Sequence, residues 1–588
     1  MRKVLALTLA ATMALNLAAC GGKTESAATD AAPAETAAQG GETTGEPAGE
    51  AVASDQVAKI EWAAYDDLIK QIKSATDMDK REAMMHEAED MLMNTWATIP
   101  LYYYNDHYMQ KENIQGIYAN PNTQKFFWKA TGMKDKTLRI CLASEPEYLD
   151  PTMCTATDNM TNAHASFIGL MNYNEKGELY PEMAESYEIS DDKLTFTFKI
   201  KPGLKWSDGE VLDANDIVYS WNRAVKPETT CAYEYLFAGI EGYEEKKLNI
   251  QASEDGLTFT VKLTAPCAYF LDLCSFPTFF PVPQQAVEAA DETNPGSWAM
   301  EPGFPVSGPF ITESWKHNES LVYAKNPNFY RTSEQTVDRL EFMLSANDSA
   351  IFTAYKSGNL DFIENVAPDE LDAVLGTPEF HILDQMGPYY MSFNVTSPLF
   401  AGKTVQQAAD MRHAIALLID RDYIVSNISK TGQKIANTFV PPVCADGHGG
   451  EFRQNNDGYE YPEAEDLGYF KLAYSDEKVE QARELLKGAG YEFGDDGMLS
   501  ADTPLSFEYM TNEMASHVAI AQAIQQDLAV LGIDMKIKNV DWNLFLADRH
   551  NGKYDVARHG WTSDYNDPIN FLELFATDSV NNDAQIGR

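Results

Sequence analysis

The chain has 588 residues and a formal net charge of -44, which comes from 89 acidic and 45 basic residues. A surplus of negative charge repels nucleic acid and anionic lipid headgroups, so we expect no nucleic-acid partner. Hydrophobic residues make up 44% of the chain and aromatic residues 11%, which allows a large buried core divided between at least two domains.

The first twenty residues have the pattern of a secretion signal that ends at a cysteine. Arg2 and Lys3 precede an apolar stretch at residues 4–19, and residues 17–20 read LAAC. This stretch of sixteen residues is short for a bilayer span of about 20, so it indicates a cleaved signal at residues 1–19. LAAC resembles the bacterial lipobox, which implies acylation of Cys20. The alternative is an ordinary secretion signal that contains a cysteine.

Residues 20–58 form a linker composed almost wholly of Ala, Gly, Thr, Glu, Ser and Pro, without an aromatic residue. Such a segment buries too little apolar surface to fold. As a flexible coil of roughly 38 residues it would span about 35 Å, enough to hold a folded body off a membrane. We therefore expect a lipid-anchored protein on the extracytoplasmic face of the cell membrane, either periplasmic or outside a Gram-positive membrane.

Residues 61–130 contain two predicted helices and an apolar strand. The first helix covers residues 64–74, and the second is capped by Asp79 and runs to Asn94. The strand IPLYYY at residues 99–104 is too apolar to stand alone, so it needs a sheet to join.

Strand and helix patterns alternate from residue 138 onward, which indicates a mixed α/β fold. LTFTFKIK at 194–201 places alternate apolar residues on one face of a strand, and LTFTVKL at 257–263 repeats the phrase. Helices are predicted after Asp213, which is a typical N-cap, and within MRHAIALLID at 411–420. Further helices are predicted at 475–490 and at 515–532, the last ending at Gly532.

Motifs for catalysis, metals and nucleotides are absent from the sequence. It contains neither GxSxG nor HExxH, and AGKT at 401–404 has Ser397 where a P-loop requires glycine. The cysteines other than Cys20 have no zinc-site spacing, and we treat them as structural or free, with Cys267 and Cys274 as one conceivable pair. The sequence therefore predicts a binding protein without catalytic residues, metal or cofactor.

Several long phrases together resemble the peptide-binding solute receptors of ABC importers. These phrases are YLDP at 148–151, the block at 181–223, SGPF and KNPNFY within 307–330, MRHAIALLIDRDYI at 411–424, and the block at 541–568. The resemblance implies the two-lobed fold of periplasmic binding proteins, a Venus flytrap of class II or cluster C type, with a hinge and a ligand cleft between the lobes. It assigns residues 131–400 to the first lobe and the start of the hinge, and 401–588 to the second lobe and the return toward the first.

Residues 61–130 resemble the segment with which members of this family end, although here the segment comes first. Joining Arg588 to about Trp62 restores the usual order, so the chain resembles a circular permutant in which 61–130 packs into the first lobe. Chain termini often lie close together at a protein surface, which permits this rearrangement. A truncated duplicate and an artefact of sequence assembly are the alternatives.

The resemblance also suggests ligand-binding residues, half of them in ARHGWTSDYNDP at 557–568. It places Asp564 at the carboxylate that pairs with the ammonium of a peptide and Trp561 on the cleft wall. Arg558, Trp542, Arg549 and Tyr104 match other positions that line the cleft. In the simpler interpretation Asp564 is a turn residue, the aromatic residues belong to the core, and the arginines form ordinary ion pairs.

The resulting hypothesis is a monomeric receptor that captures oligopeptides and delivers them to a membrane permease and its ATPase. Receptors of the same fold for nickel chelates, opines or sugars are a second possibility, and the orientation of Asp564 toward the cleft discriminates between the two. A third is a surface chaperone, adhesin or peptide sensor that does not transport. Fold alone does not decide among them.

Overall fold

The computed structural model describes residues 53–588 except 121, 143–144, 147, 156, 292–295, 346, 365, 367, 448–449 and 455–457. The predicted signal, Cys20 and most of the linker therefore lie outside the described residues. In the described part of the chain, no helix is both long enough and apolar enough to span a membrane.

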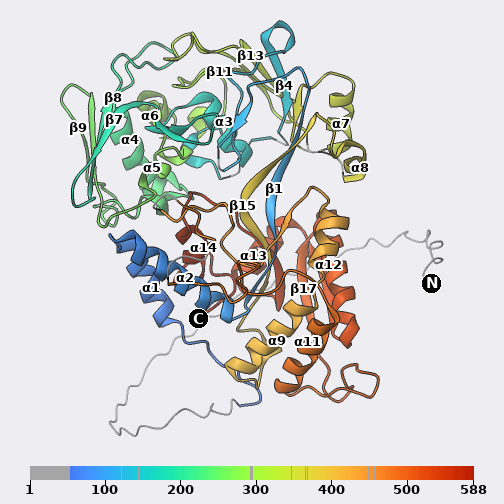
Figure 1. Cartoon of the computed structure of the whole chain (residues 1–588). Coiled ribbons are helices and arrows are strands. Elements are labelled where there is room, and N and C mark those ends of the chain that lie inside the picture. Colours follow the sequence, from blue (N-terminus) through green and yellow to red (C-terminus); the bar gives the residue numbers. More distant parts are fainter. Residues whose placement is uncertain are drawn as a thin grey trace, which may run out of the picture. The chain divides into compact units, whose positions relative to one another are not determined.

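One mixed sheet runs through both lobes of the described chain (Figure 1). Its strands follow the order β11-β12-β13-β4-β14-β1-β15-β19-β17-β18, and β16 pairs with β1. Their bounds are β1 Thr98–Gln110, β4 Thr137–Cys141, β11 Phe310–Lys316, β12 Ser320–Lys325, β13 Arg339–Met343, β14 Phe362–Ile363, β15 Phe380–Phe393, β16 Lys434–Ile435, β17 Ser506–Asn512, β18 Asp534–Val540 and β19 Val556–Gly560.

The strands β1 and β15 connect the two lobes. They have 13 and 14 residues and pair antiparallel from Thr98 opposite Ser392 to Met109 opposite Phe380. The register shifts twice, between Pro100 and Tyr102 and again between Tyr103 and Asn105. Irregularities of this kind bend a strand and re-aim its side chains, and here they lie in the predicted strand IPLYYY.

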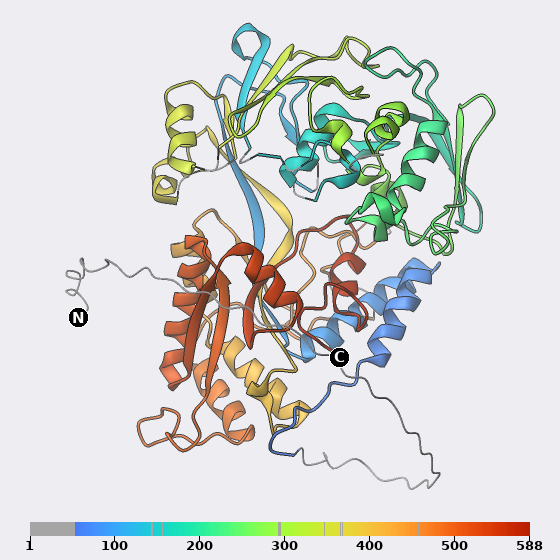
Figure 2. The same ribbon diagram turned by 180° about the vertical axis from the view of Figure 1, so that it is seen from behind.

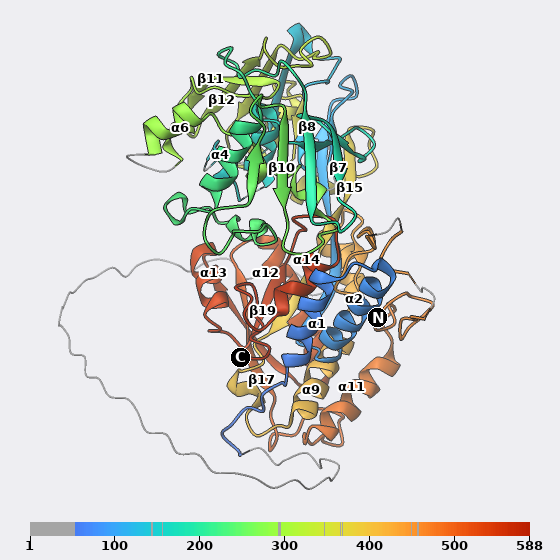
Figure 3. The same ribbon diagram turned by 90° about the vertical axis from the view of Figure 1, so that its left-hand side faces the viewer.

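The first lobe adds a four-stranded antiparallel sheet in the order β7-β8-β10-β9 (Figure 3). Its strands are β7 Ala184–Ile189, β8 Thr195–Ile200, β9 Ile250–Ala252 and β10 Thr258–Lys262. The repeated phrases LTFTFKIK and LTFTVKL form β8 and β10, which pair with each other. Phe196, Phe198 and Ile200 are buried on one face, as the alternation predicts.

Helices cover the strands of both lobes. Their bounds are α1 Ala63–Ser74, α2 Met78–Asn94, α3 Thr157–Ser166, α4 Ala214–Ala224, α5 Phe270–Leu273, α6 Gln284–Asp291, α7 Asp348–Lys356, α8 Leu371–Val374, α9 Val405–Leu418, α10 Arg421–Tyr423, α11 Asp476–Gly488, α12 Ala515–Leu528, α13 Trp542–His550 and α14 Ile569–Leu572. Two short hairpins complete the elements, β2 Tyr118–Ala119 with β3 Lys125–Phe126 and β5 Met171–Tyr173 with β6 Leu179–Pro181.

The predicted helices are present, with two adjustments at their N-termini. Asp213 caps α4 in a capping box, and α12 ends in a short turn at Gly532 with φ of 80°. The helix predicted within 411–420 begins earlier, because Thr404 and Gln407 form a capping box at the start of α9. In α2 the cap is Asp77, not Asp79, since the extended backbone of Asp77 lets its carboxylate accept from the Lys80 N–H.

The helices of the segment 61–130 pack in the second lobe, whereas the sequence analysis assigned the whole segment to the first. The α1 and α2 helices contact α14 (Figures 1 and 2). Trp62 Nε1 donates to the carbonyl of Phe575 at 2.8 Å, and the Tyr65 hydroxyl donates to that of Leu572 at 2.7 Å. Because these contacts hold α1 and α2 against residues that follow β19, only the later part of the segment, including β2 and β3, joins the first lobe.

Cys231, Cys267, Cys274 and Cys444 are free cysteines in the structure. Cys267 and Cys274 therefore do not form the pair that the sequence left open.

Candidate functional site

Asp564 lies in the loop that leads from β19 to α14. Its side chain is buried, although an ionised carboxylate in the interior requires a hydrogen-bonding or cationic partner. The residue is 7% exposed. Its Oδ2 accepts from the Tyr235 hydroxyl at 3.2 Å and from Asn570 Nδ2 at 3.5 Å. Tyr235 comes from a single-turn helix of the first lobe, Glu234–Phe237, so the carboxylate contacts both lobes.

Within the described part of the chain, the Asp564 carboxylate receives neutral donors and no cation. Burial raises the pKa of its carboxyl to about 6, although hydrogen bonds from Asn570, Tyr235 and Tyr233 oppose this rise. Among the described residues, no lysine or arginine nitrogen lies within 4 Å of the carboxylate. An ionised carboxylate in such a place is costly until a cation reaches it.

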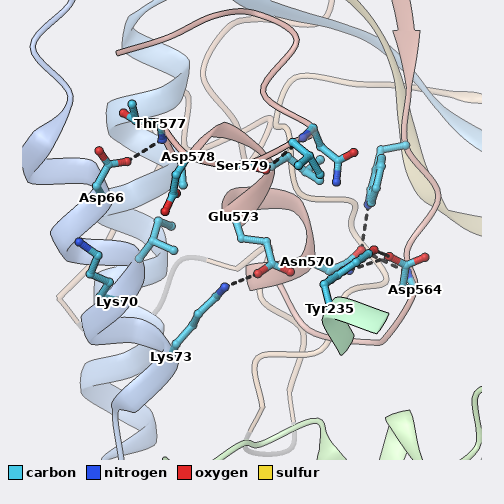
Figure 4. A pocket seen from close by; sticks show the side chains of 16 residues that line it. Asp66, Lys70, Lys73, Tyr235, Asp564, Asn570, Glu573, Thr577, Asp578 and Ser579 are labelled. Carbon is cyan, nitrogen blue, oxygen red and sulfur yellow. Dashed lines mark hydrogen bonds and ion pairs between the residues drawn. The ribbon is translucent and has the colours of Figure 1, made fainter. Parts of the chain in front are cut away.

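The carboxylate opens into a cavity of about 520 Å³, here called the Asp564 cavity (Figure 4). Trp561 lines it as well, and Trp561 Nε1 donates to Asn570 Oδ1 at 2.9 Å. The same Asn570 oxygen accepts from the Asp564 N–H at 3.2 Å. Asn570 thus holds the two predicted residues in one arrangement. The remaining lining consists of Tyr235, four residues of α1, Glu573, Leu574 and residues 576–581.

Lys73 is paired within the cavity and does not neutralise Asp564. Its Nζ lies 2.5 Å from Glu573 Oε2, and Figure 4 shows this pair between α1 and the α14 region. Asp66 and Asp578 also line the cavity, so its carboxylates outnumber its amines, which are those of Lys70 and Lys73. The arrangement favours a positively charged ligand.

Arg558 lies on β19, six residues before Asp564, and is also buried, at 7% exposed. Its Nε donates to Asn512 Oδ1 at 2.9 Å. Its guanidinium carbon lies 5.2 Å from the ring centroid of Trp542 and 5.0 Å from that of Phe545. In the described part of the chain, no carboxylate lies within 4 Å of this guanidinium. Arg558 therefore remains available for an anionic group of a ligand.

The other predicted residues have mixed surroundings. Arg549 forms an ion pair with Asp583, in which Nε and Oδ2 lie 2.7 Å apart. Trp542 is 46% exposed at the start of α13. Tyr104 lies on β1 with its hydroxyl against Gly560, where an added Cβ would meet that oxygen at 2.1 Å. The structure thus joins Asp564 with Trp561 and Arg558 with Trp542, while Arg549 has a partner within the protein.

The sequence did not indicate two residues of this site, Tyr235 and Asn570. Tyr235 stands more than three hundred residues before Asp564 in the chain, and no local pattern links the two. Asn570 follows the quoted motif by two positions, and an asparagine after a helix-starting proline is a weak signal. Among the described residues, no group of three His, Cys, Asp or Glu is placed to hold a metal ion.

The family model and the relative that match this chain are both described as binding proteins. The family model described as bacterial extracellular solute-binding proteins, family 5 Middle, matches residues 178–583. The dipeptide-binding protein DppE of Bacillus subtilis is 30% identical, with 76% of this chain and 78% of that protein covered.

Solved structures agree in fold. The murein tripeptide binding protein MppA of Escherichia coli matches with a TM-score of 0.62 and 27% identity, over 78% of this chain and 85% of that one. The Haemophilus influenzae OppA complex with RPPGFSPFR matches with a TM-score of 0.59 and 25% identity, over 77% and 85%. The mixed α/β architecture is therefore that of the cluster C periplasmic binding proteins, as the sequence predicted.

Proposed function

The chain belongs to the bacterial extracellular solute-binding proteins of family 5, and we propose that it captures oligopeptides by their free ammonium group. Members of this family bind solutes and are not enzymes. The observation that carries the proposal is the Asp564 carboxylate, which is buried, lines a cavity and receives only neutral donors from the described residues. A ligand ammonium would supply the missing charge through a charge-assisted hydrogen bond.

Two further observations support a peptide. Arg558 offers a buried guanidinium without a carboxylate partner in the described part of the chain, which suits the carboxylate that a peptide also carries. The related proteins DppE, MppA and OppA carry names that refer to peptide binding. Because a neutral sugar brings no positive charge to the buried Asp564 carboxylate, the site favours an ammonium-bearing ligand over a sugar.

The first prediction concerns the pairing between Asp564 and the ligand ammonium. Asp564→Ala should lower the affinity for a peptide with a free ammonium group by about thirtyfold or more. Loss of one partner of a buried pair costs about 2 to 5 kcal/mol. N-acetylation of the peptide should weaken binding to the unmodified protein equally and cost the variant little. Calorimetry at pH 7.5, where the carboxylate is ionised, measures all four affinities.

Asp578→Ala is the matched control, because it removes the same charge from an exposed position in the lining of the same cavity. It should leave both peptides close to their original affinities. Independent, additive losses from Asp564→Ala and acetylation would defeat the pairing.

We also propose that the protein is anchored through acylated Cys20 and delivers its cargo to a membrane permease and ATPase. Cys20→Ser should move the protein from the membrane fraction to the soluble fraction, because the mature chain then lacks its lipid. Fractionation followed by immunoblotting measures this shift, and an unchanged membrane fraction would exclude the lipobox.

Uptake of a labelled peptide should depend on the gene, and uptake that persists in a deletion strain would contradict a role in import.

We further infer that the chain is a circular permutant in which residues 61–130 belong after residue 588. The contacts of Trp62 support this order, since its Cβ lies 2.9 Å from the position of a Cβ added at Gly587. Asp66 accepts from the Thr577 N–H at 2.8 Å. We accordingly propose a first lobe within residues 131–400 and a second lobe of 401–588 completed by α1 and α2.

A further inference from the structure

A second cavity, here called the apolar cavity, has a volume of about 340 Å³ and lies beside the Asp564 cavity. It separates segments 235–240 and 263–273 of the first lobe from Tyr565 and Glu573 of the second. Most of its lining is apolar, with Leu236, Ile240, Leu263, Phe270 and Leu273 among the contributors. Ligand pockets have this size and this kind of lining.

Three side chains separate the two cavities, because Lys73, Tyr235 and Glu573 line both of them. Glu573 binds Lys73 Nζ at 2.5 Å and accepts from the Tyr565 hydroxyl at 2.5 Å. The side chain of Lys73 is 46% exposed and that of Glu573 is 21% exposed. A partly exposed ion pair contributes little stability, so this partition yields readily to a ligand.

We propose that the apolar cavity receives a bulky apolar side chain from the first residue of the cargo peptide. This proposal rests on the proposed function, in which Asp564 binds the ammonium. The Tyr235 hydroxyl contacts Asp564, and Tyr235 also lines the apolar cavity. The side chain of a first residue branches one bond from its ammonium, so it begins beside Tyr235.

The favoured cargo is therefore a peptide that begins with a residue such as leucine. Burial of an apolar side chain is favourable in proportion to the area removed from water. A first glycine would leave the cavity without that contact, and a first aspartate would bring a charge into an apolar lining.

Gly239 offers a variant that fills the cavity. It lines the cavity, and a Cβ added to it would meet no atom within 4 Å. Gly239→Phe should therefore occupy the space without strain. Gly488→Phe is the matched control, because Gly488 has the same open surroundings at the end of α11. Thermal unfolding verifies that both variants fold.

Calorimetry with Leu-Ala-Ala-Ala and Gly-Ala-Ala-Ala measures the preference. The unmodified protein and Gly488→Phe should bind the leucine peptide at least about tenfold more tightly. Gly239→Phe should bind both peptides equally. Equal affinities in the unmodified protein, or a preference that persists in Gly239→Phe, would overturn the assignment.

Cys267 provides a second readout inside the cavity. This free cysteine is half-buried and lines the cavity, and burial raises the pKa of its thiol to about 12, so alkylation is slow. At saturating peptide, Leu-Ala-Ala-Ala should protect Cys267 from N-ethylmaleimide more than Gly-Ala-Ala-Ala does, as measured by peptide mass spectrometry. Equal protection by the two peptides would place the first side chain elsewhere.

The two proposals fail in different ways. Binding that depends on Asp564 and on a free ammonium, but without a leucine preference, would remove only the apolar-cavity assignment. Binding that is indifferent to Asp564 and to acetylation, or no binding of either peptide, would remove the proposed function and the assignment with it.

Discussion

At the residue scale, the proposed role of Asp564 in ligand binding comes with a cost in stability. Its carboxyl titrates near 3.8 in an unfolded chain and near 6 in the folded one, because burial disfavours the charge. Between those values the native state retains a proton that the unfolded chain has lost. The free energy of unfolding therefore falls as the pH rises from about 4 to about 6 and stays lower above it.

Asp564→Asn should consequently stabilise the ligand-free protein at pH 7.5. An amide avoids the buried charge, and a rise in pKa of this size corresponds to roughly 1–3 kcal/mol. Urea unfolding at pH 7.5 and at pH 4 measures the difference, which should shrink at the lower pH as the carboxylate becomes protonated. A residue that serves only to form the turn predicts the opposite result, a variant that is less stable at both pH values.

The site residues differ in how well the sequence predicts them, and the reason is the range of their contacts. Asp564 and Trp561 share one motif, and their common partner Asn570 lies a few residues further along. Tyr235 reaches the site only because the lobes meet, which no local pattern encodes. Arg549 and Arg558 match cleft positions equally well in the sequence, yet only the structure shows that Asp583 pairs with Arg549.

At the element scale, local signals predict the helices better than they predict where those helices pack. The Asp213 cap and the stop at Gly532 depend on neighbouring residues alone, and both agree with the structure. The β1 strand continues to Gln110, well beyond the apolar phrase IPLYYY, because β15 pairs with its polar continuation. Pairing partners of this kind lie far away in the sequence, so the length of β1 was not predictable from it.

A buried ion pair contributes to the attachment of α2 to the second lobe. Arg81 Nη1 lies 2.7 Å from Asp567 Oδ2 and Arg81 Nη2 lies 2.8 Å from Oδ1, with the side chains 3% and 1% exposed. Arg81 Nε also donates to the carbonyl of Ile72 at 3.2 Å, which joins α1 to α2. Asp567 in turn accepts from the Ile569 N–H at the start of α14.

Arg81→Met should therefore lower the free energy of unfolding by about 3–5 kcal/mol, because Asp567 is left as an unpaired buried charge. The double variant Arg81→Met with Asp567→Asn should recover part of this loss, since the amide retains the helix cap without the charge. Urea denaturation measures both. A double variant less stable than the sum of the single changes would show that the charge of Asp567 is not the source of the loss.

At the scale of the whole molecule, the segment 61–130 completes both lobes. Its β1 strand lies between β14 and β15 in the central sheet, and its helices bind the residues that follow β19. The sequence indicated that this segment belongs with the rest of the fold, but it did not indicate the division between lobes. That division depends on side chains such as Trp62 and Arg81 finding partners near the end of the chain.

The position of the chain ends makes the order of segments testable. Gly587 and Trp62 are in contact, so residue 588 can be joined to residue 61 without an added linker. Lys134 and Asp135 lie in an exposed turn, which makes the bond between them a suitable place for new ends. A reordered chain would then run from 135 to 588 and continue directly from 61 to 134.

This reordered chain should fold like a chain of residues 61–588, because it contains the same residues and exchanges one surface connection for another. Its unfolding midpoint should lie within a few degrees, and it should bind the same peptide with the same affinity, as measured by calorimetry and calorimetric melting. A chain of residues 135–588 alone is the control, and it should not fold, since the sheet then lacks β1 at its centre. Loss of cooperative unfolding in the reordered chain would contradict the proposed order. It would show that Trp62 makes its contacts only when residues 61–130 precede the rest of the fold.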